Sequence, residues 1–269
     1  TGALYDKAQH DTKLGYAEGL SGRNATDPNN KNEADGLAKG SQDKSAYAAA
    51  VADFNKGIKD PSDNGANASY KNNPVYQSAL KGLTDGNATP ASDSHDDQSP
   101  VYAIAKQQAQ NVLFALNAAK NSSNVAQNSP KADQDLASVS GYSNTDNQPD
   151  MKDAYNAASQ AYHDANTNQP DISANLTSPA AKMAYEQAYK AAQADQGLAT
   201  QDFTNGNKSQ RPNTAADAAV YDQTQADITS GLNDGLNGSP DSGKQNANPA
   251  YKQGADYAAA VKAATNDVI

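Results

Sequence analysis

Acidic residues recur in pairs seven positions apart, a spacing that places both carboxylates on one face of a helix. Paired carboxylates can carry out glycoside hydrolysis, one as the acid and the other as nucleophile or base. A catalytic pair needs one pocket, however, whereas this chain repeats the pair three times. We therefore interpret the pairs as solvated helix faces and not as active sites. The pairs are Asp11 with Glu18, Asp53 with Asp60, and Asp227 with Asp234.

The histidines and two acidic stretches are the remaining candidates for metal chemistry. His10, His95 and His163 are far apart, and none lies in the His-x3-His or His-Glu-x2-His pattern of a helical zinc site. We expect surface histidines. Residues 93–97 (DSHDD) and 60–65 (DPSDNG) offer many oxygen atoms, but neither has the alternating acids and distant Glu of a helix–loop–helix calcium site. We expect acidic turns that cap the next helix, with calcium binding as the alternative.

The chain has no cysteine, which excludes disulfides, thiolate zinc sites and thiol nucleophiles. No nucleophile–base pair or metal-binding constellation stands out from the rest of the sequence. We therefore predict a protein that is not an enzyme, with no catalytic, cofactor-binding or metal-ligating residues and no cofactor.

Composition excludes further classes of protein. The net charge of −10 repels nucleic acid, and no apolar run reaches the length of about 18 residues that would indicate membrane insertion. Leu, Ile, Val and Phe make up only 30 of the 269 residues, so Ala must line the core and the 14 Tyr must supply its bulk. Ala is the strongest helix former. We expect most Tyr rings to be buried and Tyr142, which follows Gly141 in a loop, to be exposed.

One eighteen-residue segment occurs near both ends of the chain. YDKAQHDTKLGYAEGLSG, residues 5–22, matches YDQTQADITSGLNDGLNG, residues 221–238, at eight positions that include three glycines. The same spacing of Tyr, Asp and Gly starts again at Tyr47, and the word YAAAV occurs at 47–51 and at 257–261. Recurrence of this kind is typical of helical repeats.

We predict one all-α helical-repeat region over residues 1–269. Its antiparallel helices have a period of about 30 residues and stack either as a repeat array or as consecutive bundles. The terminal segments 1–60 and 217–269 look like copies of the same unit.

Recurrent dipeptides and glycines indicate where these helices begin and end. Asn or Ser caps a helix, and Pro fits its first turn; such starts occur at 73–74, 99–100 and 248–249, and looser ones at 129–130 and 178–179. Gly-[Leu/Tyr]-x-x-Gly predicts helix ends, because glycine adopts the left-handed conformation of a C-cap. Two glycines four apart can also admit a neighbouring helix. This pattern occurs at 15–19, 36–40, 82–86 and 231–235.

These features resemble the repeated helical regions of large cell-surface, adhesin-like proteins of lactic acid bacteria. The similarity rests on Cys-free, acidic, Asn-, Gln- and Ala-rich helices with [NS]-P-[VA]-Y starts and G-[LY]-x-x-G glycines over most of the chain. The resemblance implies a secreted Gram-positive protein on the extracellular cell surface, within a larger chain attached to the cell wall. It assigns no functional residues.

Two functional hypotheses follow from this resemblance. The first is a non-catalytic adhesion or aggregation module that binds a host glycan, mucin, a matrix protein or a neighbouring cell surface. The alternative is a structural spacer that holds another module away from the cell wall. Several linkers are longer and less uniform than a rod requires, and long loops more often carry contacts, so the sequence favours adhesion.

Overall fold

A computed structural model describes residues 2–88, 91, 99–137, 142, 148–207 and 209–266. Within these residues all regular structure is helical and no strand occurs, which confirms the all-α fold class. Asp93–Asp97, with His95, lies outside the described residues. The helices are α1 (Gly2–Ser21), α2 (Lys31–Asn55), α3 (Pro74–Gly86), α4 (Pro100–Asn121), α5 (Ser123–Ala126), α6 (Ala132–Leu136), α7 (Gln148–Asn166), α8 (Pro179–Asn205), α9 (Ala215–Leu236), α10 (Ser242–Ala247) and α11 (Pro249–Asn266), with a short 3-10 turn at Ser173–Asn175.

The chain divides into two compact units, and helices α4, α7 and α8 contribute residues to both. The first unit comprises Thr1–Ala118, Ala132–Ala157 and Ser173–Glu186, and the second comprises Ala119–Lys131, Ala158–Ile172 and Gln187–Ile269. No described helix combines the length and the apolar character needed to cross a membrane.

Most of the predicted helix starts are confirmed. The side-chain oxygen of Asn73 accepts hydrogen bonds from the backbone N–H groups of Val75 (2.8 Å) and Tyr76 (3.4 Å), and Pro74 begins α3. Ser99, Ser178 and Asn248 cap α4, α8 and α11 in the same way. The pair at 129–130 does not start a helix, because α6 begins only at Ala132.

Replacing Asn73 by Ala is expected to lower the free energy of unfolding by about 1 kcal/mol, because two N–H groups of the first turn of α3 lose their acceptor. Chemical denaturation followed by circular dichroism measures the change. The neighbouring Asn72, which is exposed, is the matched control, and its replacement by Ala should change stability by less than about 0.5 kcal/mol. Equal losses in the two variants would contradict the capping role of Asn73.

The glycines that end helices are different from those expected. Gly22, Gly57, Gly206 and Gly238 have φ between 69° and 90° and terminate α1, α2, α8 and α9. At each of them the residue after the glycine donates its N–H to the carbonyl oxygen of the residue that stands four positions before the glycine. At Gly57, for example, Ile58 donates to Asp53 at 3.0 Å. This is the hydrogen bond of a Schellman cap. In all four cases the residue four positions before the glycine is acidic.

The Gly-[Leu/Tyr]-x-x-Gly motifs are helix contacts, as the second expectation had it, and none of their glycines adopts the left-handed conformation of a C-cap, although Gly86 is the last residue of α3. In α2, for instance, the helix continues past Gly40 to Asn55. A methyl group on Gly15 would lie 1.9 Å from the carbonyl oxygen of Glu33, and one on Gly36 would lie 2.1 Å from that of Thr12. Only hydrogen fits between the backbones of α1 and α2 at these positions.

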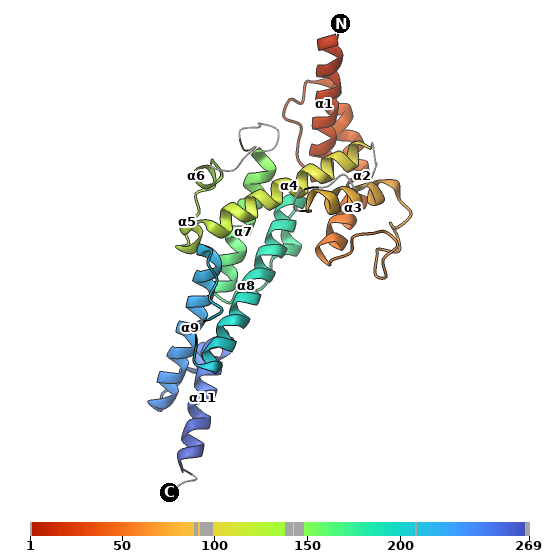
Figure 1. Cartoon of the computed structure of the whole chain (residues 1–269). Helices are drawn as coiled ribbons and strands as arrows, with labels where there is room; N and C mark the ends of the chain where they lie inside the picture. Colours follow the sequence, from red (N-terminus) through yellow and green to blue (C-terminus); the bar gives the residue numbers. More distant parts are fainter. Residues whose placement is uncertain are drawn as a thin grey trace. The chain divides into compact units, whose positions relative to one another are not determined.

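Neighbouring helices joined by these glycines run in the same direction, so the predicted antiparallel arrangement is wrong at these junctions. Along α1, the positions of Asp11, Gly15 and Gly19 face Asn30, Glu33 and Leu37 of α2 in turn. The pairs α3 with α4 and α9 with α11 have the same order of contacts. Figure 1 shows α1 beside α2, and α9 beside α11. In each of these three pairs the later helix therefore lays its first half along the second half of the earlier one.

The core has the composition that the sequence predicts. Its largest fully buried side chains are mostly Tyr, and the rest of the buried apolar set is dominated by Ala. Tyr142 is half-buried and donates its hydroxyl to Asp133, whereas Tyr5 is 64% exposed. The prediction therefore chose the wrong tyrosine as the exposed one. The fully buried rings are Tyr47, Tyr76, Tyr155, Tyr185, Tyr221 and Tyr251.

Candidate functional site

The repeated acids are not solvated helix faces, which corrects the sequence interpretation. Asp11, Glu18 and Asp53 are all more than nine-tenths buried, and Asp227 and Asp234 are half-buried. Asp60 is the exposed exception. The buried carboxylates accept hydrogen bonds from the loop or helix that follows, so they lie at the junctions between consecutive helices.

The junction from α2 to α3 shows how such an acid works. One oxygen of Asp53 accepts the N–H of Asn67 at 2.7 Å and the hydroxyl of Tyr76 at 2.8 Å. Burial acts to raise the pKa of Asp53, but these hydrogen bonds outweigh it and hold the pKa below its ordinary value. Burial and the Asp53 carboxylate raise the pKa of Tyr76 to about 12. The acid stays ionised and ties the loop and the next helix to α2.

Tyr155 on α7 donates in the same way to Asp135 near the end of α6, and three other junctions repeat this tyrosine–aspartate bond. The hydroxyl of a Tyr near the start of one helix donates to an Asp near the end of the preceding helix at 2.6 to 2.7 Å. In each pair the Asp lies within the last turn of its helix. The pairs are Tyr102 with Asp85, Tyr221 with Asp202, and Tyr251 with Asp234.

The acid seven residues earlier holds the start of the following helix. Asp11 accepts from the side-chain amide of Asn30 at 2.7 Å, and Asn30 is the N-cap of α2. Asp227 accepts from the amide of Asn248 at 2.8 Å, and Asn248 precedes α11 in the same way. In these two pairs the seven-residue spacing therefore serves two successive attachment points for one neighbouring helix, whereas in the pair of Asp53 with Asp60 the second acid is exposed.

The junction from α1 to α2 replaces the tyrosine by a second acid. Glu33 stands three residues after the cap Asn30, where Tyr76 and Tyr251 stand after Asn73 and Asn248. Burial raises the pKa of the facing Glu18, the hydrogen bond from Thr26 opposes this, and the Glu33 carboxylate raises it further. One oxygen of Glu18 has no hydrogen-bond donor among the described residues.

The expected metal-binding candidates carry no metal site within the described part of the chain. In the loop at 60–65, Asp63 accepts the N–H groups of Lys59 and Asp60, and Asp60 accepts from Ser62. These bonds make the loop an acidic turn, but the turn does not cap the next helix as predicted, because the N-cap of α3 is Asn73. His10 is exposed and His163 is half-buried, so only His10 is clearly a surface residue.

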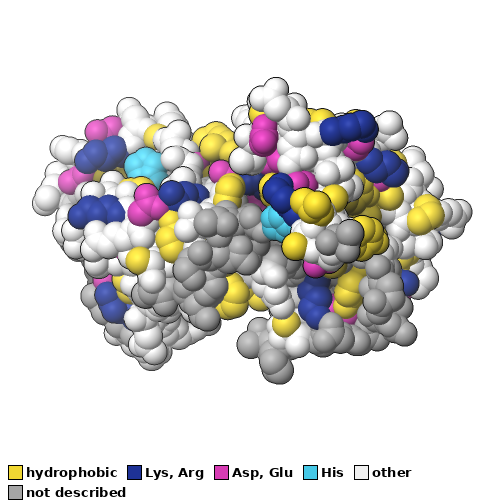
Figure 2. Space-filling model, turned by 90° about the horizontal axis from the view of Figure 1, so that it is seen from above, with side chains coloured by type: hydrophobic (Ala, Val, Ile, Leu, Met, Phe, Trp, Pro, Cys, Tyr) yellow, Lys and Arg dark blue, Asp and Glu magenta, His cyan; other side chains and the backbone are white. Residues whose placement is uncertain are grey.

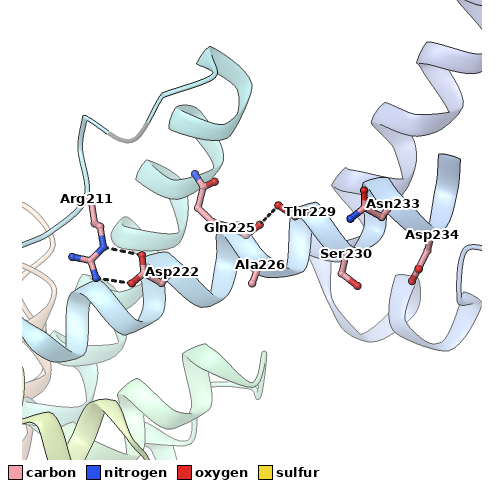
Figure 3. Close-up of a pocket in the computed structure, with 8 residues that line it drawn as sticks. All are labelled: Arg211, Asp222, Gln225, Ala226, Thr229, Ser230, Asn233 and Asp234. Atoms are coloured by element: carbon pink, nitrogen blue, oxygen red, sulfur yellow. Dashed lines mark hydrogen bonds and ion pairs between the residues drawn. The ribbon is translucent and has the colours of Figure 1, made fainter. Parts of the chain in front are cut away.

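Two hollows have side chains that could meet a ligand. A groove of about 830 Å³ runs along α9 (Figure 3), where polar residues from Asp222 to Asp234 form a row along the helix. Arg211 alone comes from the preceding loop, and its guanidinium grips Asp222 with two bonds of 2.8 and 2.5 Å. The ion pair satisfies both charges, so the groove presents mainly neutral hydroxyl and amide groups.

The second hollow lies in the first unit and has a volume of about 450 Å³. Glu18, Arg23, Asn111 and Asp150 contribute to its lining. Arg23 pairs with Asp150, yet its Nε and one terminal nitrogen are buried without an acceptor among the described residues. Burial raises the pKa of Asp150 and the Arg23 charge opposes that rise.

Comparison with known proteins adds no identity. No protein-family model, curated protein or solved structure matches the chain.

A carboxyl pair in the second unit titrates near neutral pH. Asp217 on α9 accepts from Tyr162 at 2.7 Å and from Thr214 at 2.6 Å, and it pairs with Lys120 at 2.8 Å. Asp195 on α8 faces this group. Burial, and then the Asp217 carboxylate, raise the pKa of Asp195 to about 7. Asp195 is therefore protonated in mild acid.

The second unit is expected to lose stability as pH rises toward and through 7. Because the folded-state pKa of Asp195 lies above its ordinary 3.8, its contribution is complete below that value and is lost as pH rises through about 7. Asp195→Asn should remove this slope and be more stable than the parent at pH 8, since the amide still donates to Asp217. Denaturant midpoints between pH 5 and 8 measure it. Asp256→Asn, at an exposed residue of α11, is the control and should keep the dependence of stability on pH.

Sequence reasoning found the acids and the tyrosines but did not pair them. For the pairs Asp53 with Tyr76 and Asp234 with Tyr251, the available signal was an acid four residues before a glycine, followed within about twenty residues by Asn-Pro-x-Tyr. The other tyrosine–aspartate pairs do not have this signal. The Arg23 hollow has no such signal, because Arg23 and Asp150 are 127 positions apart.

Proposed function

We propose that this chain is a non-catalytic module of an extracellular bacterial surface protein and that it acts as a structural spacer. The supporting observation is that several of its tyrosine rings are buried between helices. Tyr76, Tyr102, Tyr221 and Tyr251, which could have formed a contact surface, are buried and bonded to the preceding helix. Each of these rings joins two consecutive helices.

The surface supports the same proposal. Figure 2 shows basic and acidic side chains interspersed over the face in view, with hydrophobic side chains in small patches between them. A spacer needs a polar surface and repeated internal joints, whereas an adhesive face is usually a larger distinctive patch. The repeated junctions are what a spacer requires.

A replacement experiment tests the spacer. An adhesive module is displayed on a Gram-positive cell with this chain between the module and the wall anchor, and cell attachment is measured. Attachment should persist when an unrelated helical spacer of equal length replaces the chain, and should fall when the chain is deleted. Saturable binding of the isolated chain to mucin, a matrix protein, a glycan or a bacterial surface would overturn the proposal.

Adhesion or aggregation is the second candidate, and the Arg23 hollow favours it. Unpartnered donors on Arg23 and an unpartnered acceptor on Glu18 could receive hydroxyl groups of a host glycan. The test is a glycan array with the isolated chain and two variants. Arg23→Gln should abolish saturable binding, while Arg211→Gln, which breaks the surface ion pair on α9, should leave it unchanged.

A further inference from the structure

The first half of α1 presents an apolar face that nothing covers within the described residues. Leu4 and Tyr5 are 76% and 64% exposed. We call Leu4, Tyr5 and Gln9 the α1 face. The amide of Gln9 donates to the hydroxyl of Tyr5 at 2.8 Å, so the two polar groups pair with each other on the same helix. An apolar groove of about 590 Å³ between α1 and α2 continues from Tyr5 to Gly36.

The repeated segment shows how the same face is used elsewhere. In α9 the equivalent residues are Val220, Tyr221 and Gln225; the first two are fully buried and Gln225 nearly so. The hydroxyl of Tyr221 donates to Asp202, and the amide of Gln225 donates to the carbonyl oxygen of Ala199 at 2.6 Å. Both acceptors lie in the second half of the preceding helix, α8. A face of this type therefore packs on the second half of another helix.

The second half of α11 is a face of the complementary type, and it is also uncovered. Val261 is 50% exposed, and Ala260 and Ala264 are exposed. We call Asp256, Ala260, Val261 and Ala264 the α11 face. In the identical word YAAAV of α2, Val51 is 1% exposed. The second halves of α1, α2, α3 and α8 each receive the next helix of the chain, and that of α9 receives α11, whereas this half of α11 receives none of the described residues.

We propose that the α1 face of one molecule packs on the α11 face of a second copy of this chain, head to tail. The contact reproduces the parallel packing of α1 with α2, in which the first half of the later helix lies along the second half of the earlier one. Three of the five most exposed large hydrophobic side chains among the described residues, Leu4, Tyr5 and Val261, are then covered. The contact is heterologous and adds copies one after another.

The charges of the two faces fit this pairing. The N-terminal turns of α1 carry the positive end of a helix dipole. On α11, the exposed carboxylate of Asp256 pairs only with Lys252 on its own helix among the interactions described, at 2.5 Å. Asp11 has the same bond to Lys7 and in addition holds the start of α2 through Asn30. Among the described residues, no helix start bonds to Asp256 as α2 does to Asp11.

Two blocking variants test the pairing on the whole chain. Tyr5→Glu places a charge in the α1 face, and Val261→Glu places one in the α11 face; both sites are exposed, so folding should persist, as circular dichroism can verify. Because each face consists of only three or four side chains, whereas a stable interface has about 20 to 30 residues on each side, the parent should associate weakly, with Kd between about 10 µM and 1 mM. Sedimentation equilibrium over that range measures it.

The mixture of the two variants is the decisive sample. Each variant alone should be monomeric, with association at least tenfold weaker than that of the parent. An equimolar mixture should form dimers and stop there, because one contact remains possible and the other two faces are blocked. Leu236→Glu on α9, outside both faces, should associate like the parent.

The contrary outcomes are equally distinct. A parent that is monomeric at about 1 mM, a blocked variant that dimerises as the parent does, or a monomeric mixture would each overturn the head-to-tail contact. The contact rests on the packing of the repeats and not on the spacer role. Failure of the mixture therefore leaves the cell-display experiment unaffected, and the reverse also holds.

Discussion

Gly231→Ala is expected to lower the free energy of unfolding of the second unit by about 3 kcal/mol, at the upper end of the usual cost of overpacking. The added methyl group would lie 1.9 Å from the carbonyl oxygen of Tyr251 and 2.8 Å from its carbonyl carbon. These are backbone atoms of α11, so no side chain can turn away. The two helices must separate, and the bond from Tyr251 to Asp234 lengthens with them.

Gly197 provides the matched control for this substitution. It lies in α8 of the same unit, and a methyl group there would meet no atom within 4 Å. Gly197→Ala should raise the free energy of unfolding by about 0.5 to 1 kcal/mol, because Ala is the better helix former. Denaturant unfolding of both variants, followed by circular dichroism, gives the comparison. A change of the same sign in both would refute the glycine contact.

Tyr221→Ala is expected to cost about 3 to 5 kcal/mol, as deletion of a fully buried aromatic ring usually does. Tyr221→Phe keeps the ring and removes one hydrogen bond to an ionised group, so it should cost about 1.5 to 3 kcal/mol. Asp202 then keeps only its bonds from Gln210. The ratio of the two losses in unfolding free energy separates the contribution of ring packing from that of the hydrogen bond.

The partner and the repeated copy supply the controls for Tyr221. In a double-mutant cycle with Asp202→Ala, the coupling with Tyr221→Phe should be between about 0.5 and 3 kcal/mol. Tyr5→Ala, at the equivalent but exposed position of α1, should leave the denaturation midpoint unchanged. A loss at Tyr5 as large as at Tyr221 would show that exposure does not distinguish the two copies.

Acid should weaken this junction in the parent. Burial acts to raise the pKa of Asp202, but the bonds from Gln210 and Tyr221 outweigh it and keep the pKa below its ordinary 3.8. The contribution of Asp202 is therefore present above pH 3.8 and is lost as pH falls through its folded-state value. Tyr221→Phe should reduce this acid sensitivity.

Local rules predicted the helices and their starts well. Asn73 with Pro74 combines a side-chain acceptor with a residue that lacks an N–H, and both properties act within one turn. The Ala-lined core with Tyr as its bulk follows in the same way from composition. No long-range information is needed for either prediction.

Helix direction and the role of glycine could not be predicted by the same reasoning. Gly36 and Gly57 look alike in sequence, yet the first admits the backbone of α1 and the second adopts a left-handed turn at φ 90°. An acid stands four residues before Gly57, but the same is true of Gly15 and Gly231, which pack against a neighbouring helix, so this spacing alone does not separate the two roles. Parallel packing likewise depends on loops that return along the helix.

Parallel overlap also determines how the chain would carry load. Tension applied between the start of α1 and the end of α2 pulls the two helices past one another, so every contact from Asp11 to Lys44 resists at the same time. An antiparallel hairpin would instead open one contact after another. Residues 22–30 return along α1 and are slack under that tension; they could extend by up to about 30 Å once the pair has slid apart. Each such junction would therefore resist tension until its two helices slide apart, and the loop between them would then extend.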